Sequence, residues 1–445
     1  MSTKPETVKN NSAFSAWAER IFKLKEHKTD VRTEIIAGFT TFMTMAYILI
    51  VNPQILSNTG MDKGALFTAT ALSAAVATLV MAFHANYPFA LAPGMGLNAF
   101  FAFTVVLGMK YSWEVALAAI LIEGIIFIIL SVTPVREAIV NAIPLSIKHA
   151  VSVGIGLFIA FIGARSARLV VNSEATGVTL GNLKSPEVIL TIIGLIITGY
   201  LLAKGVKGAL LIGILITTVL GIPLKVTPMP SSIISAPPSL SPILFKFDFS
   251  KVFAGEFLVV MFTFLFVDMF DTVGTLVGVA SKADMLDKDG KLPRAKQALL
   301  ADAIGTTFGA IVGTSTVTTY VESAAGVAEG GRTGLTALTV AVLLLLSLLF
   351  APILTIVPAA ATAPALIIIG LFMLSPIFKI NFEDYTEAIP AFLTIIMMPF
   401  TYSIAEGLVF GIVSYVVLKL ISGKTKDISV TMYILAILFI LKSIL

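Results

Sequence analysis

Five carboxyl side chains lie inside long apolar stretches of this sequence, where an ionisable group is costly and usually has a function. Asp268 and Asp271 are three residues apart, a spacing that puts both on one side of a helix. Glu322, Asp302 and Glu123 lie in other apolar stretches. No Lys or Arg lies in the middle of the two stretches that hold Asp268, Asp271 and Glu322.

These acids predict two kinds of chemistry. A carboxyl group removed from water binds a proton more readily and releases it when water returns. An ionised carboxylate only accepts hydrogen bonds, so two of them can hold the N–H groups of a planar heterocycle. We therefore expect Asp271, Glu322 and Asp268 to carry protons in a symporter. Asp268 could equally be a structural acid, and Glu123 and Asp302 fit packing or gating better than substrate binding.

The composition identifies the class of protein that holds these acids. Of 445 residues, 57% are hydrophobic and 13% are charged, and none is Cys. A soluble domain has about 25% charged residues, and so apolar a chain is not disordered. The lack of Cys excludes a disulfide scaffold, thiolate catalysis and Cys-ligated metal sites. The remaining class is a polytopic, all-α membrane protein.

Fourteen segments approach the length of about 20 mostly apolar residues that a membrane helix needs. The expected spans are 33–52, 65–84, 88–109, 113–132, 146–164, 186–204, 207–222, 255–279, 296–313, 315–330, 333–352, 359–375, 384–402 and 404–421. A shorter apolar segment, 428–444, either lies in the membrane interface or continues the bundle.

The distribution of Lys and Arg predicts the orientation. With the N-terminus inside, 21 of the 30 Lys and Arg fall on the cytoplasmic side and eight on the other, with Lys442 unassigned. We expect an integral protein of the plasma membrane, the inner membrane of a bacterium, with both termini in the cytoplasm. The net charge of +4 then reflects topology and does not predict nucleic-acid binding.

An internal echo predicts two halves of opposite orientation. Pro144 precedes Ile155-Gly156-Leu157-Phe158 as Pro358 precedes Ile369-Gly370-Leu371-Phe372, with the same spacing. The echo pairs span five with span twelve, a shift of seven spans. An odd number of spans per half inverts the second half, as in many secondary transporters.

Spans three and ten are interrupted at corresponding places in the two halves. Pro93, Gly94 and Gly96 break the first of them, just before Asn98. In the second, 316–320 is β-branched and aromatic, which favours a short strand. We expect a broken helix in span three and a short strand in span ten, each leading into a half-helix whose free N–H groups face a solute at the membrane midplane. Asn98 either contacts that solute or caps its half-helix.

Several longer motifs resemble one transporter family. They are Thr40-Thr41-Phe42-Met43-Thr44-Met45-Ala46-Tyr47, Gly94-Met95-Gly96-Leu97-Asn98-Ala99-Phe100-Phe101, Asp271-Thr272-Val273-Gly274, Thr318-Thr319-Tyr320-Val321-Glu322-Ser323 and the later Pro390-Ala391-Phe392 and Pro399-Phe400-Thr401-Tyr402-Ser403. Over residues 30–422 the chain resembles the nucleobase–cation symporters related to the bacterial uracil permease, most closely their AzgA-like branch of purine permeases.

The resemblance implies two inverted seven-span repeats divided into a core domain and a gate domain, with a short strand followed by a half-helix in each of spans three and ten. The implied division is a tail 1–32, core 33–132 and 255–352, gate 133–222 and 353–422, an external linker 223–254 and a C-terminal segment 423–445. Dimerisation through the gate domain is implied in the same way.

The resemblance also implies which residues bind the base. Asp271 and Glu322 would hold it, with Asn98 and Gly96 beside it and backbone contacts near Phe100 and Val321. Two positions depart from the uracil and xanthine branches, and we place both in the site. Ser323 stands where those branches have Asn, and Thr275 stands where the uracil permease has His. These departures fit the branch associated with adenine, guanine and hypoxanthine.

The residues disfavour two alternative functions. A transporter of inorganic or carboxylate anions would have the same fold, but acids without a basic partner disfavour a negatively charged substrate. A membrane enzyme is disfavoured because the sequence contains neither a Gly-Asp pair nor a His-Glu-x-x-His motif. The turn at 287–290 lacks the ligand spacing of a calcium loop, and we expect neither a metal nor a cofactor beyond the coupling proton.

Overall fold

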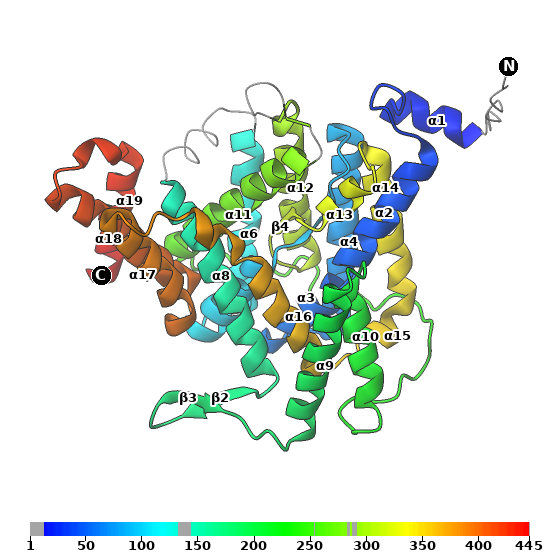
Figure 1. Ribbon diagram of the computed structural model, residues 1–445, viewed down its shortest axis with the longest axis horizontal. Coiled ribbons are helices and arrows are strands. Elements are labelled where there is room, and N and C mark those ends of the chain that lie inside the picture. Colours follow the sequence, from blue (N-terminus) through cyan, green and yellow to red (C-terminus); the bar gives the residue numbers. More distant parts are fainter. Residues whose placement is uncertain (1–12, 132–143, 253, 283–284, 287–291, 445) are drawn as a thin grey trace.

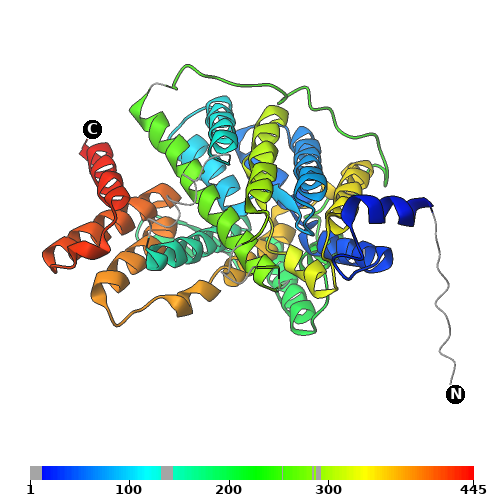
Figure 2. The same cartoon turned by 90° about the horizontal axis from the view of Figure 1, so that it is seen from above.

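The computed structural model describes residues 13–131, 144–252, 254–282, 285–286 and 292–444, which form a bundle of mostly long helices (Figure 1). The expected turn at 287–290, the first part of the tail and the start of the expected gate domain at 133–143 lie outside these residues. α1 and the C-terminal helix α19 lie at opposite ends of the molecule (Figure 2).

The first half of the chain contains spans one to seven and a hairpin. Its elements are α1 (Ala13–Phe22), α2 (Val31–Met45), α3 (Ile48–Leu56), η1 (Ser57–Thr59), α4 (Lys63–Val80), η2 (Met81–Ala85), β1 (Leu91–Pro93), α5 (Met95–Ala99), η3 (Phe100–Gly108), α6 (Trp113–Ser131), α8 (Leu145–Ser166), β2 (Val170–Ser173), β3 (Gly177–Leu180), α9 (Pro186–Ala203) and α10 (Ala209–Gly221).

The second half contains spans eight to fourteen and a final helix. Its elements are α11 (Gly255–Lys282), α12 (Ala295–Val312), β4 (Val317–Thr319), α13 (Ser323–Ala328), α14 (Gly334–Ser347), η4 (Leu348–Phe350), α15 (Ala351–Leu354), α16 (Ala359–Phe372), η5 (Ser375–Lys379), α17 (Tyr385–Thr401), α18 (Ile404–Ile421), η6 (Thr425–Asp427) and α19 (Val430–Ile444).

Capping residues explain where several spans begin. The side chains of Asp30, Asp62, Ser185, Asp384 and Ser403 each accept a hydrogen bond from a backbone N–H in the first turn of the helix that follows. Those N–H groups have no partner within the helix. Each cap therefore fixes the start of a span near the predicted boundary.

The helices agree with the expected membrane architecture. Eight helical stretches of the described ranges are long and apolar enough to cross a membrane. The other expected spans are the two broken ones, the shorter helices α10 and α17, and the acid-bearing helices α11 and α12. The fold is thus all-α and polytopic, with short strands in spans three and ten.

Three further elements of the structure lie outside the fourteen expected spans. The tail contains α1, which buries Ala18 and Phe22 and exposes Phe14, Trp17 and Ile21 along one stripe. Between α8 and α9 the chain forms the antiparallel hairpin β2–β3, which was not predicted. The segment 428–444 forms α19, which packs against α18 and α11.

The echoed glycines meet where α8 and α16 cross. A Cβ on Gly156 would lie 2.8 Å from the carbonyl oxygen of Gly370, and a Cβ on Gly370 would clash with the carbonyl oxygen of Gly156. Only glycine allows the two backbones to approach this closely. The repeat found in the sequence therefore marks the contact between corresponding spans five and twelve.

Packing divides the spans into two sets. α8 packs on α16, α17 and α18, and α9 packs on α10 and α16. In the other set α2 packs on α14, and α12 packs on α4 and α6. α10 also packs on α2, and α5 on α8, so the division into a gate and a core stays a prediction.

The two broken spans meet through their strands. β1 pairs antiparallel with β4, in the register Leu91 with Thr319, Ala92 with Thr318 and Pro93 with Val317. Two further backbone bonds extend the pairing, from Gly94 N to the oxygen of Thr316 and from Tyr320 N to the oxygen of Ala90. Since every strand residue is buried, this irregular backbone lies inside the protein, as membrane depth requires.

Candidate functional site

A cavity of about 1040 Å³ lies between the β1–β4 pair and α11 on one side and α8, α10 and α16 on the other. Five of the expected site residues belong to its wall, namely Asp271, Glu322, Gly96, Thr275 and Val321. Val321 is 55% exposed although it lies within the bundle, because it faces this open space. The fold thus brings Asp271 of α11 and Glu322, next to α13, to one cavity.

Four expected site residues are not part of this wall. Asn98 is buried and accepts a hydrogen bond from the Ser315 hydroxyl, while its amide lies 3.5 Å from the carbonyl oxygen of Pro93. Phe100 packs edge-on against Phe264. The roles of Asn98 and Phe100 in binding a base stay predictions, since neither residue belongs to the cavity wall.

Ser323 and Asp268 also lie behind the wall. The Ser323 hydroxyl accepts a hydrogen bond from the backbone N–H of Ala90 at 2.9 Å, which ties the start of α13 to the entry of β1. Asp268 is fully buried one turn before Thr272, whose hydroxyl contacts it at 3.1 Å. Both residues support the wall in this arrangement, and their direct roles stay predictions.

Glu322 is held by a residue of span one. The Tyr47 hydroxyl donates a hydrogen bond to Glu322 Oε1 at 2.5 Å, and Tyr47 is only 1% exposed. Tyr320, also in the cavity wall, donates instead to the carbonyl oxygen of Pro93 at 2.6 Å and so holds the two breaks together.

A second group of acids meets at Thr272, behind the cavity wall. Thr272 Oγ1 lies 3.1 Å from Asp268 Oδ1, 2.8 Å from Asp302 Oδ1 and 2.9 Å from Thr318 Oγ1. A hydroxyl has one proton and donates it to one acceptor. The contact with the second carboxyl is therefore a hydrogen bond only when that carboxyl carries a proton of its own.

Thr318 links this group to the cavity, because it belongs to the wall as well as to β4. Its neighbour Thr316 donates to Glu123 Oε2 at 2.9 Å. Asp302 and Glu123 thus contact the site's supporting residues, and their expected role in packing or gating stays a prediction. Thr318 of β4 is linked to the acids of spans eight and nine through Thr272, and Thr316, just before β4, bonds to the acid of span four.

Four basic side chains also belong to the wall, which the sequence analysis did not expect. They are Lys148 and His149 in the first turns of α8, Lys207 between α9 and α10, and Lys379 at the end of η5. Lys207 forms an ion pair with Glu329, just after α13. These cations lie at helix ends, whereas Asp271 lies in the middle of α11.

Sequence reasoning missed two residues of the site, Tyr47 and Thr272. Both lie within motifs that carried the family resemblance. Thr272 also lies one helical turn after Asp268 in the sequence, whereas no sequence pattern places Tyr47 near Glu322. Neither Pro nor Gly marks the interruption between α2 and α3 where Tyr47 lies. Within the described ranges, no three or more His, Cys, Asp and Glu side chains gather as a metal site would need.

Comparison with known proteins agrees with this architecture. The sequence profile described as "Permease family" matches residues 32–410. An adenine permease of Escherichia coli is 46% identical over 95% of this chain and 95% of its own. A guanine/hypoxanthine permease of Bacillus subtilis is 47% identical over 94% of this chain and 98% of its own.

Solved structures show the same fold at low sequence identity. The transmembrane domain of a cyanobacterial bicarbonate transporter superposes with a TM-score of 0.64 and 15% identity, covering 85% of this chain and 97% of that one. A murine anion transporter of solute carrier family 26, in its inward-facing state, gives a TM-score of 0.62 and 12% identity over 94% and 74% of the chains. The fold is therefore that of transporters built from two inverted seven-span repeats.

These matches confirm the resemblance seen in the motifs and its fold. The relatives named above are permeases and not enzymes, and they cover nearly the whole chain. The chain is thus an integral membrane protein that belongs to the permease family of xanthine, uracil and purine transporters.

Proposed function

We propose that this permease imports purine bases, namely adenine, guanine or hypoxanthine, together with protons. The observation that carries the proposal is the pair Asp271 and Glu322 in one cavity wall, next to the paired strands of spans three and ten. Their carboxylates can accept hydrogen bonds from the N–H groups of a base. The names of the adenine and guanine/hypoxanthine permeases among the relatives support this class of substrate.

The surroundings of the acids support the proposed proton coupling. Asp271 and Glu322 share an otherwise largely apolar cavity, so protonation removes a charge that is costly there. The hydrogen-bond count at Thr272 supports a further proton on Asp268 or Asp302. Binding of base and proton would together permit the core to move against the gate, which exposes the cavity to the other side of the membrane.

The orientation and assembly belong to the same proposal. Both termini would lie in the cytoplasm and the gate would form the contact of a homodimer. The cavity wall includes the connection between α9 and α10 and the start of α8, which are the expected cytoplasmic ends. Because the chain contains no Cys, single cysteines at Lys25 and Thr176 can report the orientation through their labelling from each side.

One observation favours a second candidate, an anion transporter. Lys148, His149, Lys207 and Lys379 all belong to the cavity wall. Purines remain the better proposal because Asp271 and Glu322 would repel an anion, and no described Lys or Arg forms an ion pair with either acid.

Uptake assays test the proposal. Cells that lack their own permeases would express the protein and receive radiolabelled adenine, guanine, hypoxanthine or uracil, with and without a protonophore. We expect purine uptake that the protonophore abolishes. Uptake that persists in the presence of the protonophore would refute proton coupling. If protein verified in the membrane took up none of the bases, the anion transporter would be the better candidate.

A further inference from the structure

Span one is interrupted opposite the breaks of spans three and ten, and Tyr47 lies at the interruption. α2 ends at Met45 and α3 begins at Ile48. Between them the backbone tightens, since Leu49 N bonds to the oxygen of Ala46 and Ile50 N to that of Tyr47, each three residues back. Such a tight turn within a long helix often marks a functional position.

The Tyr47 hydroxyl at this turn forms a hydrogen bond with Glu322. The Tyr47 side chain is 1% exposed within the apolar core, and its hydroxyl reaches Glu322 Oε1 at 2.5 Å. The neighbouring Thr44 hydroxyl lies 3.4 Å from the backbone oxygen of Glu322, so span one contacts this residue twice. Both Tyr47 and Glu322 belong to the cavity wall.

Proton counting assigns different roles to the two oxygens of Glu322. Because the phenol donates its proton to Oε1, that oxygen is an acceptor in the ionised form of Glu322. While the phenol remains the donor, a proton that binds to Glu322 binds to Oε2. An ionised Oε2 accepts an N–H of a ligand, whereas a protonated Oε2 donates to a ligand nitrogen or oxygen.

We propose that Tyr47 is the positioning residue of Glu322, which fixes Oε1 so that Oε2 alone exchanges a proton and meets the base. This inference rests on the proposed function and goes beyond it, because it names the residue that links proton occupancy to the hydrogen-bonding edge of the substrate. The Tyr47 bond stabilises the ionised carboxylate, so its loss favours the protonated form.

The test is purine binding as a function of pH. The full-length protein in lipid nanodiscs would bind radiolabelled adenine and hypoxanthine between pH 5 and pH 9. In Tyr47→Phe the ionised carboxylate loses one hydrogen bond to a charged group, which shifts the protonation equilibrium of Glu322 toward the protonated form by about tenfold. The pH of half-maximal binding should rise by about one unit, which corresponds to the same free energy.

Tyr320→Phe is the matched control. It removes a hydroxyl from the same wall, but one that bonds to Pro93 and does not contact Glu322. We expect weaker binding with the midpoint unmoved. In Glu322→Gln, which cannot titrate, Tyr47→Phe should cause no further shift. An unmoved midpoint in Tyr47→Phe, or an equal shift in Tyr320→Phe, would overturn the inference.

A second replacement tests the inference if Tyr47→Phe fails to fold. 3-Fluorotyrosine at position 47 keeps the ring and makes the hydroxyl a stronger donor, so the midpoint should move to lower pH. A shift upward, or none, would contradict the role of Tyr47. Wild-type protein that binds no purine at any pH would instead refute the proposed function itself.

Discussion

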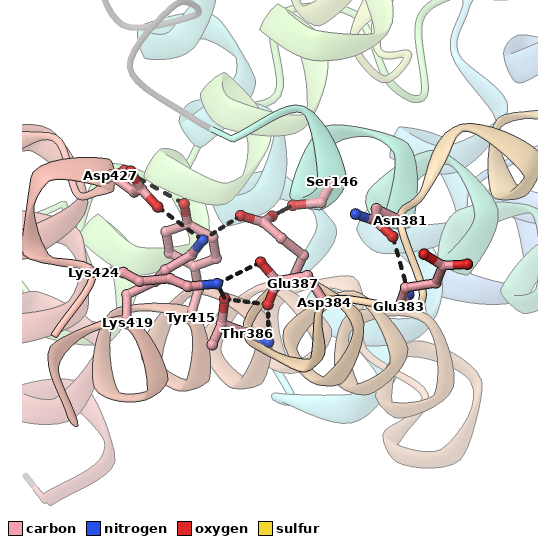
Figure 3. Close-up of polar contacts among 10 residues, drawn as sticks. All are labelled: Ser146, Asn381, Glu383, Asp384, Thr386, Glu387, Tyr415, Lys419, Lys424 and Asp427. Atoms are coloured by element: carbon pink, nitrogen blue, oxygen red, sulfur yellow. Dashed lines mark hydrogen bonds and ion pairs between the residues drawn. The ribbon is translucent and has the colours of Figure 1, made fainter. Parts of the chain in front are cut away.

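Two groups of carboxylates in this molecule differ in whether basic side chains form ion pairs with them. Where α17, α18 and η6 meet, Lys419 pairs with Glu387 at 2.7 Å and with Asp427 at 3.2 Å, and Lys424 pairs with Asp384 at 2.7 Å (Figure 3). In the cavity, no ion pair reaches Asp271 or Glu322 from the described residues.

The difference separates a structural use of charge from a functional one. A buried acid without a counter-ion lowers stability, so its presence in a membrane span points to function. Paired acids at helix ends can be explained by stability alone. The Ser146 hydroxyl further stabilises the paired acids, because it donates a hydrogen bond to Glu387 and so links α8 to α17.

The largest effect should come from the cavity acids. In Glu322→Gln and Asp271→Asn we expect purine uptake to fall at least about tenfold and up to about 100-fold, since each removes a charged acceptor from the ligand. The free energy of unfolding should not fall, because the variants remove an uncompensated charge. Radiolabelled uptake and thermal unfolding in detergent would measure both.

Glu387→Gln is the matched control for these two variants. It makes the same change within the paired cluster, so it should lower the unfolding temperature and leave uptake within about twofold. Equal uptake by Glu322→Gln and Glu387→Gln would remove the distinction between the two groups.

The next effect should come from Thr272, which bonds to the buried acids behind the cavity. Thr272→Val keeps the shape of the side chain and deletes the hydroxyl between Asp268 and Asp302. We expect proton-driven accumulation to fall about tenfold, the cost of one bond to a charged group. Thr272→Ser restores the hydroxyl and should restore accumulation; if Val and Ser variants behave alike, the hydroxyl has no role.

The sequence predicted the parts of this site that depend on local chemistry. Proline and glycine at 93–96 and the β-branched run at 316–320 mark the two breaks, which the structure confirms as β1 and β4. An acid within an apolar stretch is likewise visible without a structure. The echo at Gly156 and Gly370 was visible because close backbone packing requires glycine at both positions.

The sequence could not predict features that arise from tertiary contact. Tyr47 meets Glu322 across 275 residues of chain. Whether Asn98 faces the solute or the Ser315 hydroxyl depends on a rotation of α5 that periodicity does not fix. The sequence could not place the basic side chains of the wall near the acids, because distance along the chain gives no information about a shared cavity.

The paired cluster should respond to mutation through stability. The Lys419 side chain is 3% exposed, so Lys419→Met leaves Glu387 and Asp427 without their cation. We expect the free energy of unfolding to fall by about 1–3 kcal/mol, as for other bonds between charged groups that are partly buried. Uptake per folded molecule should stay within about twofold, and a lost uptake at unchanged stability would assign this cluster a part in transport.

The smallest effect should come from Lys424, in the exposed part of the same cluster. Hydrogen bonds from Lys424 and from the hydroxyl and N–H of Thr386 hold the pKa of Asp384, at the N-cap of α17, well below its usual value of 3.8. The ionised carboxylate therefore adds stability at neutral pH, and this contribution fades as the pH falls below about 4.

Lys424→Ala should lower the unfolding temperature slightly at pH 7 in low salt. The difference from wild type should shrink in high salt and at acid pH, because Lys424 is 43% exposed and salt screens such pairs. Unfolding scans of Lys424→Ala and Lys419→Met under the same conditions make the comparison direct. If Lys424→Ala lowered the unfolding temperature as much as Lys419→Met, burial would not determine which charges stabilise this protein. The contrast with the cavity acids would then rest on the uptake measurements alone.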